Sequence, residues 1–166
     1  DLAQLTSATT VVGGAGDDTI VGFAGADSLD GGGGSLNTLV LNATSTDLNR
    51  ASDLQLENID VIDASTSSSG VLLNLSSQLG EAFEIAGSSF ADTITGSNVS
   101  DAFMGFAGAD SLDGGDGTTD TLRLTATSAD LNAATDSRLV NIEVIDASAS
   151  TSGVLININS QSDSFQ

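Results

Sequence analysis

The feature that most constrains this chain is an internal repeat of 83 residues. The string FAGADSLDGG occurs at residues 23–32 and again at residues 106–115. When residues 13–78 are shifted onto residues 96–161, about 41 of the 66 positions are identical. Duplicated units of this kind favour an architecture in which each unit stacks on the next and contacts mainly its neighbours. We therefore expect two solenoid units, residues 1–83 and residues 84–166.

A shorter period lies inside each unit. An acidic or amide side chain recurs every nine residues, with one spacing of ten in each unit: Asp18, Asp27 and Asn37, then Asp92, Asp101, Asp110 and Asp120. A large apolar residue stands two places after each of them: Ile20, Leu29, Leu39, Ile94, Phe103, Leu112 and Leu122. Glycines precede them. This is the nonapeptide G-G-x-G-x-D-x-U-x of calcium-binding parallel β-helices, and residues 13–21, GGAGDDTIV, match it at every specified place.

The glycine-rich segments, about residues 13–41 and 87–124, resemble the RTX (repeats-in-toxin) family, of the type found in large bacterial adhesins and surface-layer proteins. The resemblance implies a right-handed parallel β-roll, Ca²⁺ as the bound ion and export by type I secretion. We therefore expect an all-β chain that forms a right-handed parallel β-roll/β-helix solenoid with calcium-binding turns.

Elementary chemistry agrees with this interpretation. Glycine permits the positive φ of a tight turn, turn carbonyls and carboxylates are oxygen ligands that suit Ca²⁺, and the apolar residue fills the interior. Two nonapeptides complete one coil, so ligands about 18 residues apart should face each other across an ion: Asp92 with Asp110, Asp101 with Asp120, and Asp18 with Asn37. The predicted calcium ligands are Gly14, Gly16, Asp18, Gly25, Asp27, Gly31, Asn37, Asp92, Asp101, Gly108, Asp110, Gly115, Gly117 and Asp120.

Several of these positions depart from the motif. The turns at residues 87–92 and 96–101 lack inner glycines, and Asn37 offers only a neutral oxygen, so we expect weaker sites there. Three further turn carboxylates either ligate calcium or are solvated, and both interpretations stay open: Asp30, Asp113 and Asp116. Four more lie in strand-like runs, where an outward, solvated face is expected: Asp60, Asp63, Glu143 and Asp146.

The segments between the glycine-rich turns, residues 38–86 and 121–165, alternate apolar and polar residues in runs of a few residues. Such runs indicate short strands, so the solenoid is expected to continue there without calcium at every turn. Residues 45–55 and 128–138 are more polar and predict a short helix or loop that bulges from one coil. Thr46 and Ser128 are the candidate N-caps.

Composition supports calcium and excludes other partners. The chain carries 23 Asp and Glu against 3 Lys and Arg, a formal charge of −20, although 39% of its residues are hydrophobic. Such a chain needs a counter-ion to become compact, and without Cys or His only oxygen ligands are available. Three arginines cannot form a nucleic-acid footprint. No apolar run approaches the length that inserts into a membrane.

The expected function is structural. Without His, Lys or Tyr, the chain lacks the usual bases and most cationic groups of β-helix enzymes, so no catalytic site is predicted. One hypothesis is a calcium-stabilised repeat of a secreted or cell-surface bacterial protein, such as an adhesin, a surface layer or an extracellular fibre. The other is a calcium-triggered folding and secretion module of an exported RTX hydrolase or toxin. Both place the chain outside the cell, with calcium ions and neighbouring copies or further repeats as partners.

The ends of the chain lead to one further expectation. Residues 3–12 align with the internal residues 86–95, with Thr9 in the place of Asp92, and Phe165 corresponds to Phe83 after a one-residue deletion. Neither end therefore resembles a cap. We expect a middle piece of a longer array, whose copies associate end to end.

Overall fold

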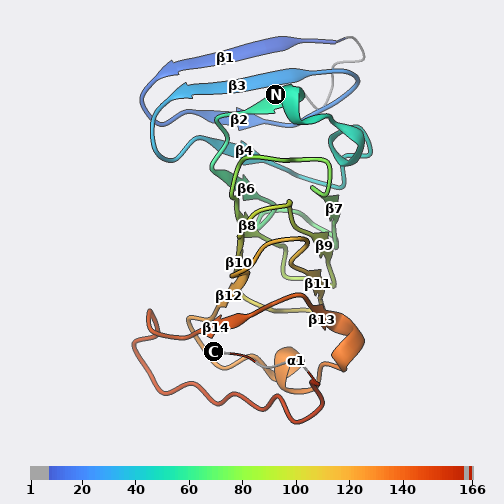
Figure 1. Cartoon of the computed structure of the whole chain (residues 1–166), viewed down its shortest axis with the longest axis vertical. Helices are drawn as coiled ribbons and strands as arrows, with labels where there is room; N and C mark the ends of the chain where they lie inside the picture. The colour runs from blue at the N-terminus through green and yellow to red at the C-terminus, as the bar shows by residue number, and fades with distance from the viewer. Residues whose placement is uncertain (1–7, 163–164, 166) are drawn as a thin grey trace.

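The computed structural model describes residues 8–162 and 165, and these form a stack of short coils (Figure 1). Each of seven successive coils contributes one strand to each of two faces, and every strand pairs in parallel with the strand one coil away. The even-numbered strands form one seven-stranded sheet: β2 (Thr19–Val21), β4 (Thr38–Val40), β6 (Val61–Asp63), β8 (Glu84–Ala86), β10 (Ala102–Met104), β12 (Thr121–Arg123) and β14 (Val144–Asp146). The expectation of an all-β parallel solenoid is confirmed.

The odd-numbered strands form the opposite face in two separate sheets. The three-stranded sheet contains β1 (Thr10–Ala15), β3 (Ser28–Gly33) and β5 (Leu56–Glu57). The four-stranded sheet contains β7 (Leu72–Asn74), β9 (Thr93–Thr95), β11 (Ser111–Asp113) and β13 (Leu139–Val140). Most strands are only two or three residues long, because the chain must turn a corner before and after each one.

The core is a stack of apolar side chains from the two faces. In each three-residue strand the middle side chain points inward, since side chains alternate along a strand, and parallel register places it on its counterpart in the next coil. The inward residues of the even-numbered strands are Ile20, Leu39, Ile62, Ile85, Phe103, Leu122 and Ile145. All seven apolar residues of the nonapeptide pattern are buried, which confirms that part of the sequence interpretation.

The first glycine run differs from the prediction. Residues 13–16 were expected to form a tight turn, but β1 continues in extended form to Ala15, and β3 continues to Gly33. Gly14 pairs with Gly32 and Ala15 with Gly33, and the two long strands are visible at one end of the stack (Figure 1). Two glycine-rich segments side by side have few side chains to force a corner, so their main chains pair instead.

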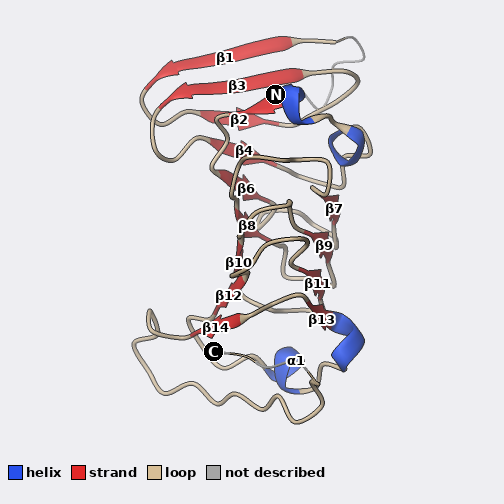
Figure 2. Ribbon diagram, in the orientation of Figure 1, coloured by secondary structure: helices blue, strands red, loops and turns tan. Residues whose placement is uncertain are grey.

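Short helices occur where the odd-numbered face is interrupted, and again one unit later (Figure 2). They are the 3₁₀ turns η1 (Leu48–Arg50), η2 (Asp53–Gln55) and η3 (Asp136–Arg138) and the α-helix α1 (Ala129–Asn132). Asn49 replaces the missing strand: its Oδ1 accepts the N–H of Asn74 at 2.9 Å, and its Nδ2 donates to Leu72 O at 3.0 Å. Asn132 makes the equivalent bonds to residues 155 and 157. The bulging segments therefore connect one coil to the next through side chains.

The caps of these helices are partly as expected. Ser128 is the N-cap of α1, and its hydroxyl accepts the N–H of Leu131 at 3.0 Å. The choice of Thr46 was wrong, because Asp47 is the N-cap of η1 and the hydroxyl that accepts the N–H of Leu48, also at 3.0 Å, belongs to Ser45. Ser45 lies 83 residues before Ser128, so the repeat would have identified it. No helix of the described residues is long and apolar enough to cross a membrane.

Candidate metal centre

Polar side chains line the corner before six of the seven even-numbered strands. We call the residues directly before these strands the first column: Asp18, Asn37, Asp60, Phe83, Asp101, Asp120 and Glu143. In five of the six steps along this column, a side-chain oxygen accepts the main-chain N–H of the member one coil earlier, at 2.6–3.0 Å. The chain turns here, so these N–H groups lack a strand partner. A short acidic or amide side chain supplies one.

A second column lies before the odd-numbered strands, and three aspartates of the repeat occupy it. Asp27 Oδ1 accepts the N–H of Thr9 at 2.9 Å, Asp92 Oδ1 accepts that of Val71 at 2.7 Å, and Asp110 Oδ1 accepts that of Asp92 at 3.0 Å. The other carboxylate oxygen of each aspartate accepts an N–H from its own turn. Each carboxylate thus connects two coils.

The structure brings together the three pairs predicted from the spacing of about 18 residues. Asp110 bonds to the N–H of Asp92, Asp120 to that of Asp101, and Asn37 to that of Asp18. In each pair the side chain of the later residue contacts the main chain of the earlier one. The role of these residues as calcium ligands remains a prediction.

These carboxylates are buried and form no close ion pair, although the charge of Arg138 acts on Asp110 from a greater distance. Asp27, Asp92, Asp101, Asp110 and Asp120 are all at most 5% exposed. Among the described residues, the only ion pair within 4.0 Å joins Arg123 to Glu84 at the surface. Burying a charge is costly unless it is paired. A cation at these corners would remove that cost.

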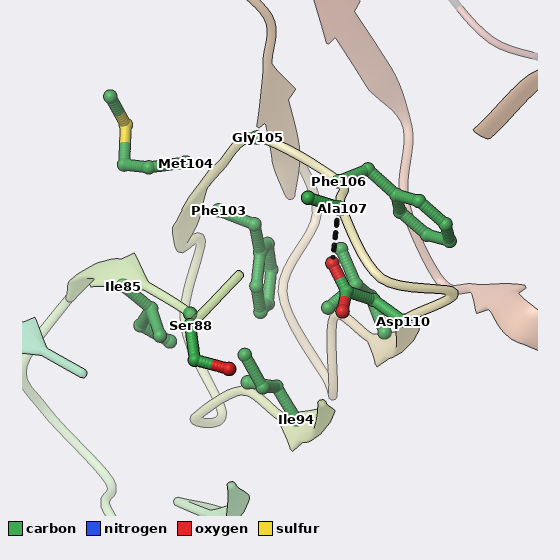
Figure 3. A pocket seen from close by; sticks show the side chains of 11 residues that line it. Ile85, Ser88, Ile94, Phe103, Met104, Gly105, Phe106, Ala107 and Asp110 are labelled. Atoms are coloured by element: carbon green, nitrogen blue, oxygen red, sulfur yellow. Dashed lines mark hydrogen bonds between the residues drawn. The ribbon is translucent and has the colours of Figure 1, made fainter. Parts of the chain in front are cut away.

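Burial also changes the proton affinity of the aspartates. Removal from solvent raises the pKa of Asp110 to about 6 and the pKa of Asp120 to about 6, and it raises the pKa of Asp101 as well. The carboxylate of Asp110 lies beside a small cavity of about 50 Å³ with apolar walls that include Ile94 and Phe103 (Figure 3). Its second oxygen accepts the N–H of Ala107 at 2.8 Å. These aspartates bind a proton more readily than solvated ones, and a metal ion would compete with that proton.

The predicted glycines serve two different purposes. Gly14, Gly16, Gly25, Gly108 and Gly115 have φ between 62° and 123°, which favours glycine; four of them lie outside the strands, whereas Gly14 lies within β1. Gly31 and Gly117 do not have positive φ. A Cβ at Gly31 would collide with Asn58 O, and one at Gly117 would collide with the carboxylate of Asp120, so these two glycines provide space.

In the turns without inner glycines, a serine of the same turn donates hydrogen bonds to the aspartate. The N–H and hydroxyl of Ser88 both donate to the carboxylate of Asp92, at 2.7 and 2.8 Å. Ser97 does the same for Asp101, at 2.6 and 2.9 Å. A serine thus supplies two donors where the full motif has glycine. That metal sites are weaker at these two turns remains a prediction.

The remaining turn carboxylates lie at the surface. Asn58 Nδ2 donates to Asp30 Oδ1 at 2.7 Å, and this bond holds the pKa of Asp30 below its ordinary value. Asn141 Nδ2 donates to Asp113 Oδ1 at 2.8 Å. Asp116 is exposed. Whether these three residues also ligate calcium stays open.

Two carboxylates lie elsewhere than the sequence predicted. Asp60 and Glu143 were expected on an outward, solvated face, but both are first-column residues: Asp60 Oδ2 accepts the N–H of Asn37 and Glu143 Oε2 that of Asp120, each at 2.8 Å. Asp63 and Asp146 do lie toward the surface, where they accept N–H groups of their own turns. The missed signal is that both misassigned residues directly precede a strand, as Asp18 does.

The corners suit a hard cation held by few side chains. Among the described residues, no three His, Cys, Asp or Glu side chains converge on one point, so main-chain carbonyls would complete any coordination shell. Asp18 Oδ2 and Asp120 Oδ2 are buried without a hydrogen-bond partner. A Cβ on Gly13 would lie 2.5 Å from both Asp18 Oδ2 and Gly31 O, so these two oxygens approach the same space. Oxygen ligands of this kind fit Ca²⁺.

Comparison with known proteins agrees with this chemistry. No curated protein and no solved structure matches the chain. The RTX calcium-binding nonapeptide repeat matches it in four copies, over residues 6–35 and 86–119. These segments contain most of the column aspartates and the turn glycines. These two segments thus match RTX repeats, a repeat family that binds Ca²⁺.

Proposed function

We propose that this chain is a calcium-stabilised structural repeat of a secreted or cell-surface bacterial protein, such as an adhesin, a surface layer or an extracellular fibre. The observation that carries the proposal is the set of buried column carboxylates that form no close ion pair. Inside a cell calcium is scarce and these charges oppose folding. Outside, millimolar calcium binds the folded coils and stabilises them by mass action.

The duplication favours a structural role over a second candidate. That candidate is a calcium-triggered folding and secretion module of an exported hydrolase or toxin, and the RTX repeats support it equally. However, in each 83-residue unit glycine-rich coils alternate with coils that side chains connect, and a stalk or lattice gains length by copying such a unit. Neighbouring sequence distinguishes the two: further 83-residue units support the first candidate, and an adjacent catalytic domain supports the second.

Asp110→Asn is expected to weaken calcium binding by roughly tenfold or more, because a charge-assisted contact contributes about 1.5–3 kcal/mol. Asp110 is buried in an RTX turn between two coils. The matched control is Asp63→Asn, since Asp63 serves only a surface turn. Isothermal titration calorimetry with calcium measures both variants. Equal affinity and stoichiometry in the two variants would refute the assignment of Asp110 as a ligand.

The last described coil supports association between copies. In the first unit residues 72–74 form β7, which pairs with β9. The inward side chain of β7, Leu73, is 2% exposed. In the second unit the equivalent residues 155–157 pair with no described strand, and Ile156 is 37% exposed. The counterpart of β9 one unit earlier is β1 (Thr10–Ala15). We therefore infer that β1 of a second copy adds to residues 155–157, as in other cases where a strand joins a free sheet edge.

Sedimentation velocity in calcium is expected to detect concentration-dependent association of the chain. Ile156→Glu should abolish this association, because Ile156 occupies the inward position. Leu155→Glu is the control, since Leu155 is 68% exposed and is the counterpart of the outward Leu72. A monomer at all concentrations, or equal association of both variants, would contradict head-to-tail stacking.

A further inference from the structure

The two units differ at one buried corner of the first column. Asn37 in the first unit is replaced by Asp120 in the second, 83 residues later. Asn37 Oδ1 accepts the N–H of Asp18 at 3.0 Å, and Asp120 Oδ1 accepts the N–H of Asp101 at 2.7 Å. Both side chains are almost completely buried. One side-chain atom thus makes the same bond in both units, and the difference lies in the other.

The second side-chain atom is satisfied in only one unit. Asn37 Nδ2 donates a hydrogen bond to Asn58 O at 3.0 Å and closes the corner. In the second unit the equivalent atom is Asp120 Oδ2, and the equivalent carbonyl belongs to Asn141. Asp120 is 0% exposed, and its Oδ2 has no hydrogen-bond partner. Where the first unit has a donor and an acceptor, the second has two acceptors.

The main chain around the two corners is alike. A Cβ on Gly31 would collide with Asn58 O and with the side chain of Asn37. A Cβ on Gly114, 83 residues later, would collide with Asn141 O and with the side chain of Asp120. Asn58 and Asn141 both have positive φ, 54° and 52°. In both units the carbonyl and the column side chain therefore lie against the same glycine.

The surroundings of Asp120 are acidic. Glu143 Oε2 accepts the N–H of Asp120, and the charges of Asp101, Glu143 and Asp113 add to burial in raising the pKa of Asp120 to about 6. At neutral pH the Asp120 carboxylate is ionised, and no Arg lies within 4.0 Å of it among the described residues. A carboxylate beside a carbonyl in a negative environment selects a hard cation over an anion or a neutral donor.

We propose that Asp120 Oδ2 and Asn141 O bind a calcium ion, and that the amide of Asn37 takes the place of this ion in the first unit. The proposal rests on the calcium binding proposed above. It adds that the two units are not equivalent, because this corner is closed permanently in one and by calcium in the other. Asp120 belongs to the nonapeptide series, but Asn141 and Glu143 lie outside that series and beyond the matched residues 86–119. The proposal therefore adds a carbonyl ligand that the repeat motif does not supply, and it adds the difference between the two units.

Reciprocal substitutions test the proposal. Asp120→Asn should bind one calcium ion fewer than the unaltered chain, and it should melt roughly 2–6 °C higher in chelator because the new amide can donate to Asn141 O. Asn37→Asp should bind one ion more and should melt lower in chelator, since it loses its bond to Asn58 O. Calorimetric stoichiometry and thermal melts followed by circular dichroism give both readouts.

Asp110→Asn is the matched control for the effect in chelator. Both oxygens of Asp110 accept N–H groups, so an amide there must point a donor at a donor and should lower the melting temperature. The proposal is overturned if Asp120→Asn binds as many ions as the unaltered chain, or if it melts lower in chelator as Asp110→Asn does. Absence of calcium binding by the unaltered chain would instead overturn the proposed function.

Discussion

Millimolar calcium is expected to stabilise the folded chain by several kcal/mol and to raise the folded, β-rich fraction of a chain that is only marginally stable in chelator. One ion at a concentration 100 times its dissociation constant contributes about 2.7 kcal/mol, and the repeat supplies more than one candidate corner. The buried carboxylates explain why the effect is large, because without a cation the folded chain must bury Asp27, Asp110 and Asp120 unpaired. Far-ultraviolet circular dichroism and thermal melts in chelator and in calcium measure it.

Magnesium is the control for this experiment. It demands octahedral geometry and gives up its water reluctantly, whereas the corners offer one carboxylate oxygen and main-chain carbonyls. It should therefore stabilise the chain much less than calcium at the same concentration. Identical spectra and melting temperatures with chelator and with calcium would show that folding does not depend on the ion.

The pH dependence of stability is expected to reverse its sign when calcium is added. Burial raises the pKa of Asp110 and of Asp120 from 3.8 to about 6. Between about pH 4 and 6 the folded chain therefore holds protons that the unfolded chain has released. In chelator this stabilisation is complete below the lower value and is lost as the pH rises through about 6. After allowance for solvent screening, the two groups together contribute on the order of 2–4 kcal/mol.

In saturating calcium the slope should be opposite. Calcium binds the ionised carboxylates, so protons displace it and stability rises with pH over the same window. Urea denaturation at pH 4.5, 5.5 and 7 with and without calcium gives the two slopes. Asp110→Asn combined with Asp120→Asn should flatten the slope in chelator. Parallel slopes in the two conditions would contradict a competition between protons and calcium at these corners.

The sequence was sufficient for the parts of the molecule that follow the nine-residue period. The period identified the inward residues, such as Leu29 and Phe103, and it paired Asp92 with Asp110 across one coil. In these coils aspartate bonds at the corner, the apolar residue fills the core, and glycine either takes a positive φ or leaves space for a neighbouring side chain or carbonyl. Where the period is regular, the sequence therefore predicts where each residue lies in its coil.

The sequence was insufficient where the period changes. Asp60 and Glu143 bond to residues 23 positions earlier, not 18 or 19, because the bulging segments lengthen those coils. Without the expected spacing, a carboxylate before a strand looks like any solvated residue. The side-chain amide of Asn49 makes two hydrogen bonds that a neighbouring strand would otherwise make. Hydrophobic periodicity cannot predict this, because Asn49 is polar. Adjacent glycine runs at residues 13–15 and 31–33 extended as strands because pairing partners lay beside them.

The direction of the hydrogen bonds between coils has a mechanical consequence. In a parallel solenoid these bonds run along the long axis of the stack, so a force that separates its two ends loads them one coil after another. Bonds loaded in this way open in sequence, whereas strands pulled along their own length must break many bonds at once. Each coil of 18–23 residues releases roughly 60–80 Å of extended chain in exchange for about 5 Å of stack height. Under tension the molecule would lengthen many-fold at a nearly constant force, and calcium would set that force.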